Sequence, residues 1–278
     1  MTIAEALTKT SAELEAAGVP DAAADAGWLL ARVTGVQALM LRFTERQMTA
    51  DESAELERLC AQRRERVPLQ YVLHDQPFLG RSFYVDERVL IPRPETELLA
   101  ERAIEALRTC GKTHPTVLDL CCGSGCLAVS MALNVPTAAV EAADLSADAL
   151  AVTKKNRDAL HARVTLHQGD LLDAVGDARY DVIVSNPPYI PAEDCKALQA
   201  EVRREPHMAL DGGADGLDFY RRIASDAPKH LEDGGRLLLE VGFDQAERVA
   251  ALLRETMTDV RTHKDYQGIL RMVEATKK

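Results

Sequence analysis

Hydrophobic residues recur at helical spacing through the first quarter of the chain, where Ala, Leu and Glu predominate. Thr2 and Glu5 have the spacing of a capping box before the first apolar run, and Gly35 follows the second run as a helix-ending residue would. The pattern predicts three helices, over residues 2–18, 21–33 and 51–66. We expect residues 1–70 to form a small helical bundle. Its core is expected to contain Trp28, Leu29, Leu30, Leu56 and Leu59.

Beyond residue 70 the spacing changes to short alternating stretches around Gly80. These stretches lie at 71–73, 83–85 and 89–91. They predict a hairpin-like connector over residues 71–92. Pro92 and Pro94 then introduce a helix over residues 95–109, because proline is favoured in the first turn of a helix.

Strand and helix patterns alternate through the rest of the chain. The strand candidates are 117–120, 138–143, 164–167, 181–185, 236–241, 260–263 and 269–273. Such alternation is typical of an α/β domain, in which helices cover both faces of a mostly parallel sheet.

Composition and charge exclude several classes of protein. With 46% hydrophobic and 28% charged residues, the chain has the composition of a folded globular protein. A net charge of −11 provides no long-range attraction for phosphate backbones or anionic membranes. We see no apolar run of the ~20 residues that a membrane span needs, and no signal-peptide pattern. We therefore expect a cytoplasmic protein that binds neither a membrane nor nucleic acid directly.

The six cysteines do not have the even spacing of a secreted disulfide framework, which indicates reduced thiols. Cys121, Cys122 and Cys126 are crowded together. Adjacent ligands without paired Cys or His residues elsewhere do not make a tetrahedral site, so we expect no metal there.

The first chemical signal is a glycine turn after the strand predicted at 117–120. The sequence Cys121-Cys122-Gly123-Ser124-Gly125 joins that strand to a helical pattern. Backbone N–H groups at the start of such a helix face the carboxyl end of the sheet, where they can bind a nucleotide or a carboxylate. Taken alone, the turn also fits a dinucleotide-binding fingerprint or a purely structural turn.

Two carboxylates flank this turn. Asp144 ends the next predicted strand, where it can accept hydrogen bonds from both ribose hydroxyls of NAD or of S-adenosylmethionine. Asp119 precedes the glycines, where it would repel a pyrophosphate but could face the cationic amino-acid end of S-adenosylmethionine. The methyl donor is therefore the favoured cofactor. An alternative is that Asp119 only caps the turn.

The second signal is Asn186-Pro187-Pro188-Tyr189, directly after an apolar strand pattern. Two consecutive prolines remove two backbone donors, so the loop presents carbonyl acceptors beside a side-chain amide. The Asn186 oxygen and the Pro187 carbonyl could accept both hydrogens of a planar NH2 group and hold its nitrogen toward an electrophile. Tyr189 would pack over the planar group. The structural alternative is a proline turn with a packed tyrosine.

Together these motifs resemble those of the class I S-adenosylmethionine-dependent methyltransferases that act on planar nitrogen. Further motifs narrow the resemblance; they lie at residues 90–99, 205–213, 215–217, 220–222 and 265–268. With the helical N-terminal module, they closely resemble the peptide chain release factor glutamine methyltransferases, the HemK/PrmC family. The resemblance covers nearly the whole chain. It implies a Rossmann-like, seven-stranded methyltransferase sheet with one antiparallel strand over residues 93–278.

The resemblance implies methyl transfer to the side-chain nitrogen of the glutamine in the Gly-Gly-Gln motif of bacterial class 1 release factors, modulating translation termination. The product of the donor would be S-adenosylhomocysteine, and the helical module would recognise the release factor. The implied cofactor contacts are Cys121, Cys122, Gly123, Ser124 and Gly125 at the methionine part, Asp144 at the ribose, and Asp170 and Leu171 at the adenine. The implied substrate contacts are Asn186, Pro187, Pro188 and Tyr189, with Arg93, Glu95 and Glu97 in one wall. Asn186 would touch both substrate and cofactor.

Two places depart from the family pattern. Cys121 and Cys122 replace the usual Gly-Thr or similar pair, and His74 replaces a usual glycine. A positive φ at Cys121 would be harder to adopt than at glycine. His74 is interpreted as a surface or hydrogen-bonded histidine.

Other interpretations remain open at this point. An adenine-N6 methyltransferase acting on DNA or RNA could use the same Asn-Pro-Pro-Tyr loop, but it needs a basic groove and a pocket for a flipped base. Acidic residues outnumber basic ones between Met1 and Val85, which argues against a nucleic-acid arm. A non-catalytic scaffold would not need Asn186 or Asp144. The Arg63, Arg64 and Arg66 cluster is interpreted as a solvated helix face or a docking site.

Overall fold

The computed structural model describes residues 1–278, which fall into two compact units. The first unit comprises Met1–Asp75 and Gln199–Arg204, and the second comprises Gln76–Leu198 and Glu205–Lys278. A short segment late in the chain therefore belongs to the helical unit, although the residues on either side of it belong to the other. None of the helices combines the length and apolar character that crossing a membrane requires.

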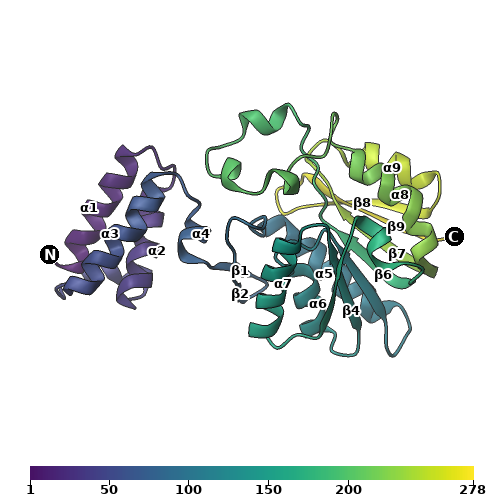
Figure 1. Ribbon diagram of the computed structural model, residues 1–278, viewed down its shortest axis with the longest axis horizontal. Helices are drawn as coiled ribbons and strands as arrows, with labels where there is room; N and C mark the ends of the chain where they lie inside the picture. Colours follow the sequence, from purple (N-terminus) through teal and green to yellow (C-terminus); the bar gives the residue numbers. More distant parts are fainter. The chain divides into compact units, whose positions relative to one another are not determined.

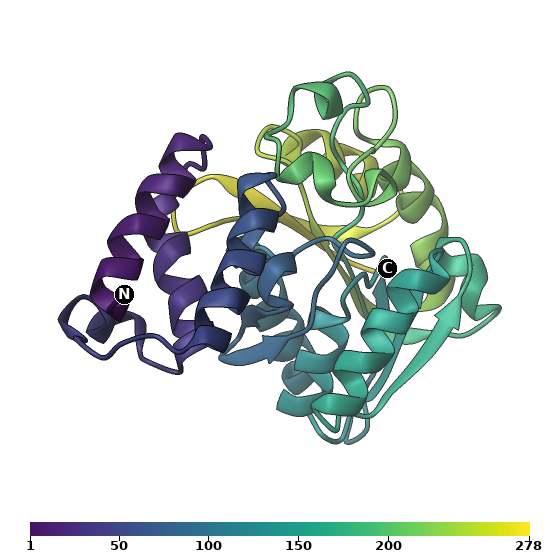
Figure 2. The same cartoon turned by 60° about the vertical axis from the view of Figure 1, so that its left-hand side comes forward.

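Helices build the first unit (Figure 1). They are α1 (Ile3–Ala16), α2 (Ala22–Thr34), η1 (Ala38–Phe43), α3 (Ala50–Arg64), α4 (Leu69–Leu73) and η4 (Val202–Arg204). The long helices α1, α2 and α3 pack side by side (Figure 2). The predicted capping box of Thr2 with Glu5 is confirmed, and Gly35 ends α2 in the left-handed conformation at φ 69°.

The expected core of this unit is confirmed except at one position. Leu29 and Leu30 of α2 are fully buried, and Leu56 and Leu59 of α3 are nearly so. Trp28 was expected inside but is 56% exposed. The buried residues of α2 recur at three- and four-residue spacing, and Trp28 lies outside that stripe.

The arginine cluster is not a solvated face. Arg63 is only 4% exposed, because it follows the buried residues of α3 at helical spacing. Its Nε donates to Asp25 at 2.6 Å and its Nη2 to Glu201 at 2.8 Å. Arg66 Nε also pairs with Glu201, at 2.6 Å. Both carboxylate partners, Asp25 and Glu201, lie far from this cluster in the sequence, which explains why the sequence pattern alone suggested exposure.

The second unit begins with a hairpin of β1 (Gln76–Phe78) and β2 (Arg81–Phe83) around Gly80, as predicted. Two neighbouring expectations are wrong: residues 71–73 belong to helix α4, and residues 89–91 form no strand. His74 ends α4 at φ 52°, a conformation that glycine adopts more readily. The unusual histidine therefore occupies a turn that favours glycine.

Seven strands form the main sheet, in the order β5-β4-β3-β6-β7-β9-β8. Their bounds are β3 (Thr116–Leu120), β4 (Ala139–Asp144), β5 (Val164–Gln168), β6 (Tyr180–Ser185), β7 (Leu231–Glu240), β8 (Thr258–Lys264) and β9 (Leu270–Thr276). Only β9 runs antiparallel to its neighbours. The predicted seven-stranded sheet with one antiparallel strand is confirmed.

Helices cover both faces of this sheet. One face is covered by α5 (Pro94–Thr109), α6 (Cys126–Asn134) and α7 (Ala147–Ala159), and the other by η2 (Leu171–Val175), α8 (Asp218–His230) and α9 (Ala246–Arg254). The remaining short helices are η3 (Asp194–Ala197) and η5 (His207–Ala209). Successive residues of a strand point to opposite faces: Val182 and Val184 of β6 pack into the first layer and Ile183 into the second. The strands are therefore apolar throughout.

Candidate active site

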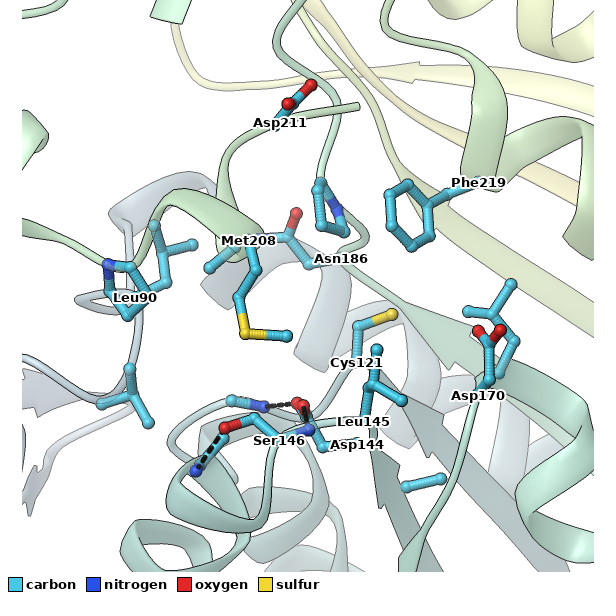
Figure 3. Close-up of a pocket in the computed structure, with 18 of the residues that line it drawn as sticks. Leu90, Cys121, Asp144, Leu145, Ser146, Asp170, Asn186, Met208, Asp211 and Phe219 are labelled. Carbon is cyan, nitrogen blue, oxygen red and sulfur yellow. Dashed lines mark hydrogen bonds between the residues drawn. The ribbon is translucent and has the colours of Figure 1, made fainter. Parts of the chain in front are cut away.

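A cavity of about 570 Å³ opens in the second unit beyond the carboxyl ends of β3, β4, β5 and β6 (Figure 3). The chain runs from β3 to β4 on one side, and β6 returns on the other side of β3. Ligands of open α/β sheets bind at such a switch point. The cavity is lined by the loops that follow these strands, by residues 88–90 before β3, and by residues 206–209, Asp211 and Phe219 after β6.

The glycine turn after β3 forms the floor of the cavity. Cys121, Gly123 and Gly125 have positive φ values of 58°, 53° and 77°. Cys121 and Gly123 line the cavity. Gly125 instead packs against helix α7, where an added Cβ would lie 2.5 Å from Thr153 Cγ2. The turn therefore needs one glycine for close packing, and Cys121 adopts the left-handed conformation despite its side chain.

Asp144 ends β4 with its carboxylate at the cavity (Figure 3). Its Oδ2 accepts from the Gly123 N–H at 2.9 Å, and its Oδ1 accepts from the Ser146 N–H at 2.9 Å. Burial raises the pKa of this carboxyl, and the backbone donors oppose that change. Each carboxylate oxygen keeps a further lone pair, so Asp144 is held rigidly and can still accept from a ligand.

Asp119 lies elsewhere. It is fully buried, and its Oδ2 accepts from the Ala128 N–H of α6 at 3.0 Å. Burial raises the pKa of this carboxyl to about 8. Asp119 has no exposed surface and does not line the cavity in which Asp144 lies. The structure places Asp119 behind the cavity surface, in contact with the first turn of α6.

The other residues of the turn are also behind the cavity surface. Cys122 and Ser124 are buried and do not line the cavity. Burial raises the pKa values of the Cys121 and Cys122 thiols, and that of Cys126 to about 12. A reactive cysteine needs a depressed pKa, so burial gives these thiols the opposite character and keeps them protonated at neutral pH.

Asp170 and Leu171 follow β5 and line the opposite wall (Figure 3). Arg222 Nη2 pairs with the Asp170 carboxylate at 2.8 Å. Leu171 and Leu145 present apolar side chains to the cavity. Two aliphatic side chains facing one cavity can sandwich a flat ring.

The loop after β6 reaches the cavity through two of its four residues, Asn186 and Pro188. Asn186 Nδ2 donates to Thr96 Oγ1 at 3.3 Å. Pro187 and Tyr189 do not line the cavity. Burial raises the pKa of the Tyr189 hydroxyl.

Two later segments hold this loop in place. Gly212 lies so close to it that a Cβ would be 2.7 Å from the Tyr189 Cα. Gln245 Nε2 donates to the Tyr189 carbonyl at 2.8 Å, and Gln245 Oε1 accepts from the Gly242 N–H at 3.0 Å. Gly212 therefore packs against the backbone of the site.

The expected wall of Arg93, Glu95 and Glu97 does not line the cavity. Arg93 Nη2 instead pairs with Glu205 at 2.5 Å, and Glu97 accepts from the Leu79 N–H at 2.8 Å. The first turn of α5 contacts the site through Thr96, which lies between the two glutamates and bonds to Asn186.

Sequence reasoning missed the wall that follows Glu205. Residues 206–209 line the cavity, with Met208 prominent among them (Figure 3). Glu205 is 5% exposed and accepts from the Ile91 N–H at 3.0 Å, which anchors this wall. Phe219 of α8 and Leu90 also line the cavity. The motif at 205–213 marked the segment, but no residue in it has a chemistry that would assign it to a site.

Family comparisons match both parts of the chain. A family model described as the PrmC N-terminal domain matches residues 5–73. A model described as the methyltransferase small domain matches residues 96–214. The second match contains the glycine turn, Asp144, Asp170 and the loop after β6, that is, most of the cavity.

Several known proteins are similar to this chain. The release factor glutamine methyltransferase of Geobacter sulfurreducens is 44% identical, over 98% of this chain and 95% of its own length. The ribosomal protein uL3 glutamine methyltransferase of Bradyrhizobium diazoefficiens is 43% identical, over 81% of this chain and 74% of its own length. A T. thermophilus 16S rRNA N2 G1207 methyltransferase, solved with AdoMet and guanosine, shares the fold at 24% identity and a TM-score of 0.55, covering 73% of this chain and 50% of that one.

Proposed function

Since the chain belongs to the family of release factor glutamine methyltransferases, we propose that it methylates a glutamine side chain of a release factor with S-adenosylmethionine. The proposed target is the side-chain amide nitrogen of the glutamine in the Gly-Gly-Gln motif of class 1 release factors. One observation carries the proposal: a single cavity contains both Asp144 and the loop residues Asn186 and Pro188. A donor bound at Asp144 and an amide bound at Asn186 would therefore meet without crossing protein.

The residues of the cavity fit the methyl donor. Asp144 supplies a buried, oriented carboxylate for ribose hydroxyls. Leu145 and Leu171 supply apolar surfaces for an adenine ring. Gly123 lines the cavity, and a Cβ added there would meet no protein atom within 4 Å, so the turn leaves open room for the methionine part. Cys121 borders the same room.

When bound, S-adenosylmethionine supplies an electrophilic methyl carbon on a cationic sulfur. The chain's own residues hold the acceptor: the Asn186 oxygen accepts one amide hydrogen of the glutamine. We assign the second hydrogen to the Pro187 carbonyl, although Pro187 itself lies between the two loop residues that line the cavity, Asn186 and Pro188. Both bonds become stronger as the amide nitrogen gains positive charge. The nitrogen forms its bond to carbon as the carbon–sulfur bond breaks, and one amide proton then leaves to water. No side chain is needed as a general base.

Replacement of Asn186 by Ala tests this role. We expect kcat to fall by about two orders of magnitude, roughly 3 kcal/mol of transition-state stabilisation, as for other oriented hydrogen bonds to developing charge. Donor affinity, measured by calorimetry, should stay within about threefold, because Asp144 and the glycine turn are untouched. Unchanged turnover would remove Asn186 from the mechanism.

We propose that the first unit recognises the release factor outside the glutamine. Its surface exposes large apolar side chains that no core requires: Trp28 at 56%, Leu39 at 76% and Phe43 at 70%. Exposed apolar groups of this size are typical of protein contact sites. The negative net charge favours a protein partner over a nucleic-acid phosphate backbone.

Ribosomal protein uL3 is a second candidate substrate, because relatives with similar identity carry that name. The same carboxamide chemistry would serve both substrates, so the cavity does not separate them. The match of residues 5–73 to the PrmC N-terminal domain favours a release factor.

The deciding experiment supplies isotope-labelled methyl donor and compares three acceptors: a purified class 1 release factor, the same factor with its Gly-Gly-Gln glutamine replaced by alanine, and uL3. We expect label in the first factor and none in its alanine variant. Preferential labelling of uL3 would move the assignment to the second candidate. Label only in added DNA or RNA would overturn the proposal.

A further inference from the structure

The ends of β6 and β7 bring two polar side chains together. The strands are parallel neighbours in which Ser185 pairs with Leu239. The next residues, Asn186 and Glu240, are therefore adjacent at the edge of the sheet. Both stand two positions beyond residues that pack under α5, namely Val184 and Leu238, so the strand period directs them to the same layer. The first turn of α5 lies over that layer and carries Thr96.

These three side chains form a buried chain of contacts. Asn186 Nδ2 donates to Thr96 Oγ1 at 3.3 Å. The Glu240 carboxyl is adjacent to Asn186 across the strand ends, and the Thr96 hydroxyl beside it favours its ionised form by lowering its pKa. Thr96 and Glu240 are each 3% exposed, and Glu240 Oε2 has no hydrogen-bond partner. The Tyr220 hydroxyl fixes the end of β7 by donating to the Glu240 carbonyl at 2.7 Å.

We propose that Thr96 and Glu240 are positioning residues, which orient the Asn186 carboxamide so that its NH2 group faces Thr96 and its oxygen faces the substrate. The proposal rests on the function proposed above, since that function gives the Asn186 oxygen its task.

The polarity of the hydrogen bonds explains this role. An ionised carboxylate only accepts, so in the proposed arrangement the Thr96 hydroxyl donates its one proton to Glu240. The Thr96 oxygen is then left to accept, and the only donor that Asn186 offers is its NH2 group. If the Asn186 carboxamide were rotated by half a turn, its oxygen would face the Thr96 oxygen, and both of these atoms are acceptors. Glu240 thereby selects one of two carboxamide orientations that would otherwise be similar in shape.

Protonation of Glu240 would remove this selection. Burial raises the pKa of its carboxyl to about 7. The charged and titratable groups that face it come from several elements: Arg93 and Glu95 at α5, Cys126 at α6, Tyr189 after β6, Tyr220 in α8 and Arg271 in β9. A protonated Glu240 could donate to Thr96 and compete with Asn186 for its oxygen. We therefore expect kcat to rise as the pH increases through about 7.

Paired substitutions at Thr96 test the relay through turnover. Thr96→Val keeps the shape and removes the hydroxyl, and we expect kcat to fall about tenfold to a hundredfold, the range for a lost hydrogen bond to a charged network. Thr96→Ser should recover most of that loss. KM for the donor should stay unchanged in both. Ser130→Ala serves as the control. It also removes a buried hydroxyl, but the Ser130 hydroxyl has no hydrogen-bond partner, so this variant should retain wild-type kcat.

Glu240→Gln tests the pH dependence. A glutamine is neutral at every pH and can donate to Thr96, so kcat should be low and flat between pH 6 and 8, where the wild type rises. The Asn186 side-chain NMR signal, assigned by its loss in Asn186→Asp, supplies a readout without substrate. It should shift with a midpoint near pH 7 in the wild type and stay constant in Glu240→Gln.

Wild-type turnover in Thr96→Val, or equal losses in Thr96→Val and Thr96→Ser, would overturn the relay. So would an Asn186 signal that does not respond to pH between 6 and 8. A wild-type protein that leaves the release factor unlabelled would count against the proposed function instead, and the NMR titration would still decide whether the relay exists.

Discussion

At the scale of single residues, the site depends on carboxylates whose surroundings give them different roles. Asp144 ends β4, and Asp119 lies near the end of the neighbouring strand β3. Burial raises the pKa of both carboxyls. Asp144 borders the cavity, whereas Asp119 has no exposed surface and bonds to the start of α6. The direction of one side chain therefore separates the carboxylate proposed to bind the cofactor from one that bonds only within the protein.

Replacing Asp144 by Ala should weaken donor binding. The variant loses the acceptor for ribose hydroxyls and the partner of the Gly123 and Ser146 N–H groups, so we expect the Kd of the donor to rise at least tenfold in calorimetry. Asp119→Asn is the matched control, because an amide oxygen can still accept from Ala128 and the side chain stays outside the cavity. A similar loss of affinity in both variants would return Asp119 to the cofactor site.

Asp119 should also make stability depend on pH. Its folded pKa of about 8 is above the unfolded value of about 4, so the folded protein keeps a proton that the unfolded chain releases. The stability that this retained proton gives the folded protein is fully present below about pH 4 and is lost as the pH rises toward 8. We expect Asp119→Asn, which does not titrate, to gain unfolding free energy relative to wild type by a few kcal/mol between pH 5 and 8. Urea denaturation at several pH values measures the difference in unfolding free energy between the variant and the wild type. A difference that does not change with pH would contradict the prediction.

At the scale of elements, glycine allows a later segment of the chain to pack closely against the loop after β6. Gly212 approaches the Tyr189 Cα, and Gly125 approaches Thr153 of α7. Neither contact has room for a Cβ. The loop that presents Asn186 is therefore held by backbone contacts with a segment more than twenty residues later in the chain, and its rigidity comes from that segment.

Gly212→Ala tests this packing. The added Cβ would lie 2.7 Å from the Tyr189 Cα, so the loop must shift. Since a displacement of about 1 Å can lower turnover about a hundredfold, we expect a large loss of kcat with donor affinity retained. Gly27→Ala in α2 is the control: a Cβ there meets no atom within 4 Å, and the helix should gain about 0.5–1 kcal/mol of unfolding free energy. Equal kcat in both variants would exclude the packing role.

At the scale of the whole molecule, the surface proposed for recognition and the residues proposed for chemistry belong to different units. The cavity and every residue proposed for chemistry belong to the second unit, whereas the exposed Trp28 and Phe43 belong to the first. We expect Trp28→Ala to raise KM for the intact release factor about tenfold, as loss of an interface anchor does. The kcat/KM for a short Gly-Gly-Gln peptide, which engages only the cavity, should not change. A parallel loss with the peptide would show damage to the fold instead.

The amino-acid sequence by itself determined the features that depend on neighbouring residues. The capping box at Thr2 and the left-handed end of α2 at Gly35 both arise from contacts within a few positions, which local chemistry decides. The glycine turn and the loop at Asn186 were recognisable because the residues that form each motif are contiguous.

Only the tertiary structure decided which side chains reach the cavity and which support it. Thr96 and Asn186 are 90 positions apart, and Arg63 and Glu201 are 138 positions apart, so no local pattern predicts either contact. The burial of Asp119 and the exposure of Trp28 likewise depend on what packs against each face. Long-range packing fixes these outcomes because it determines where solvent is excluded, and solvent exclusion sets both the contacts and the charges of the site.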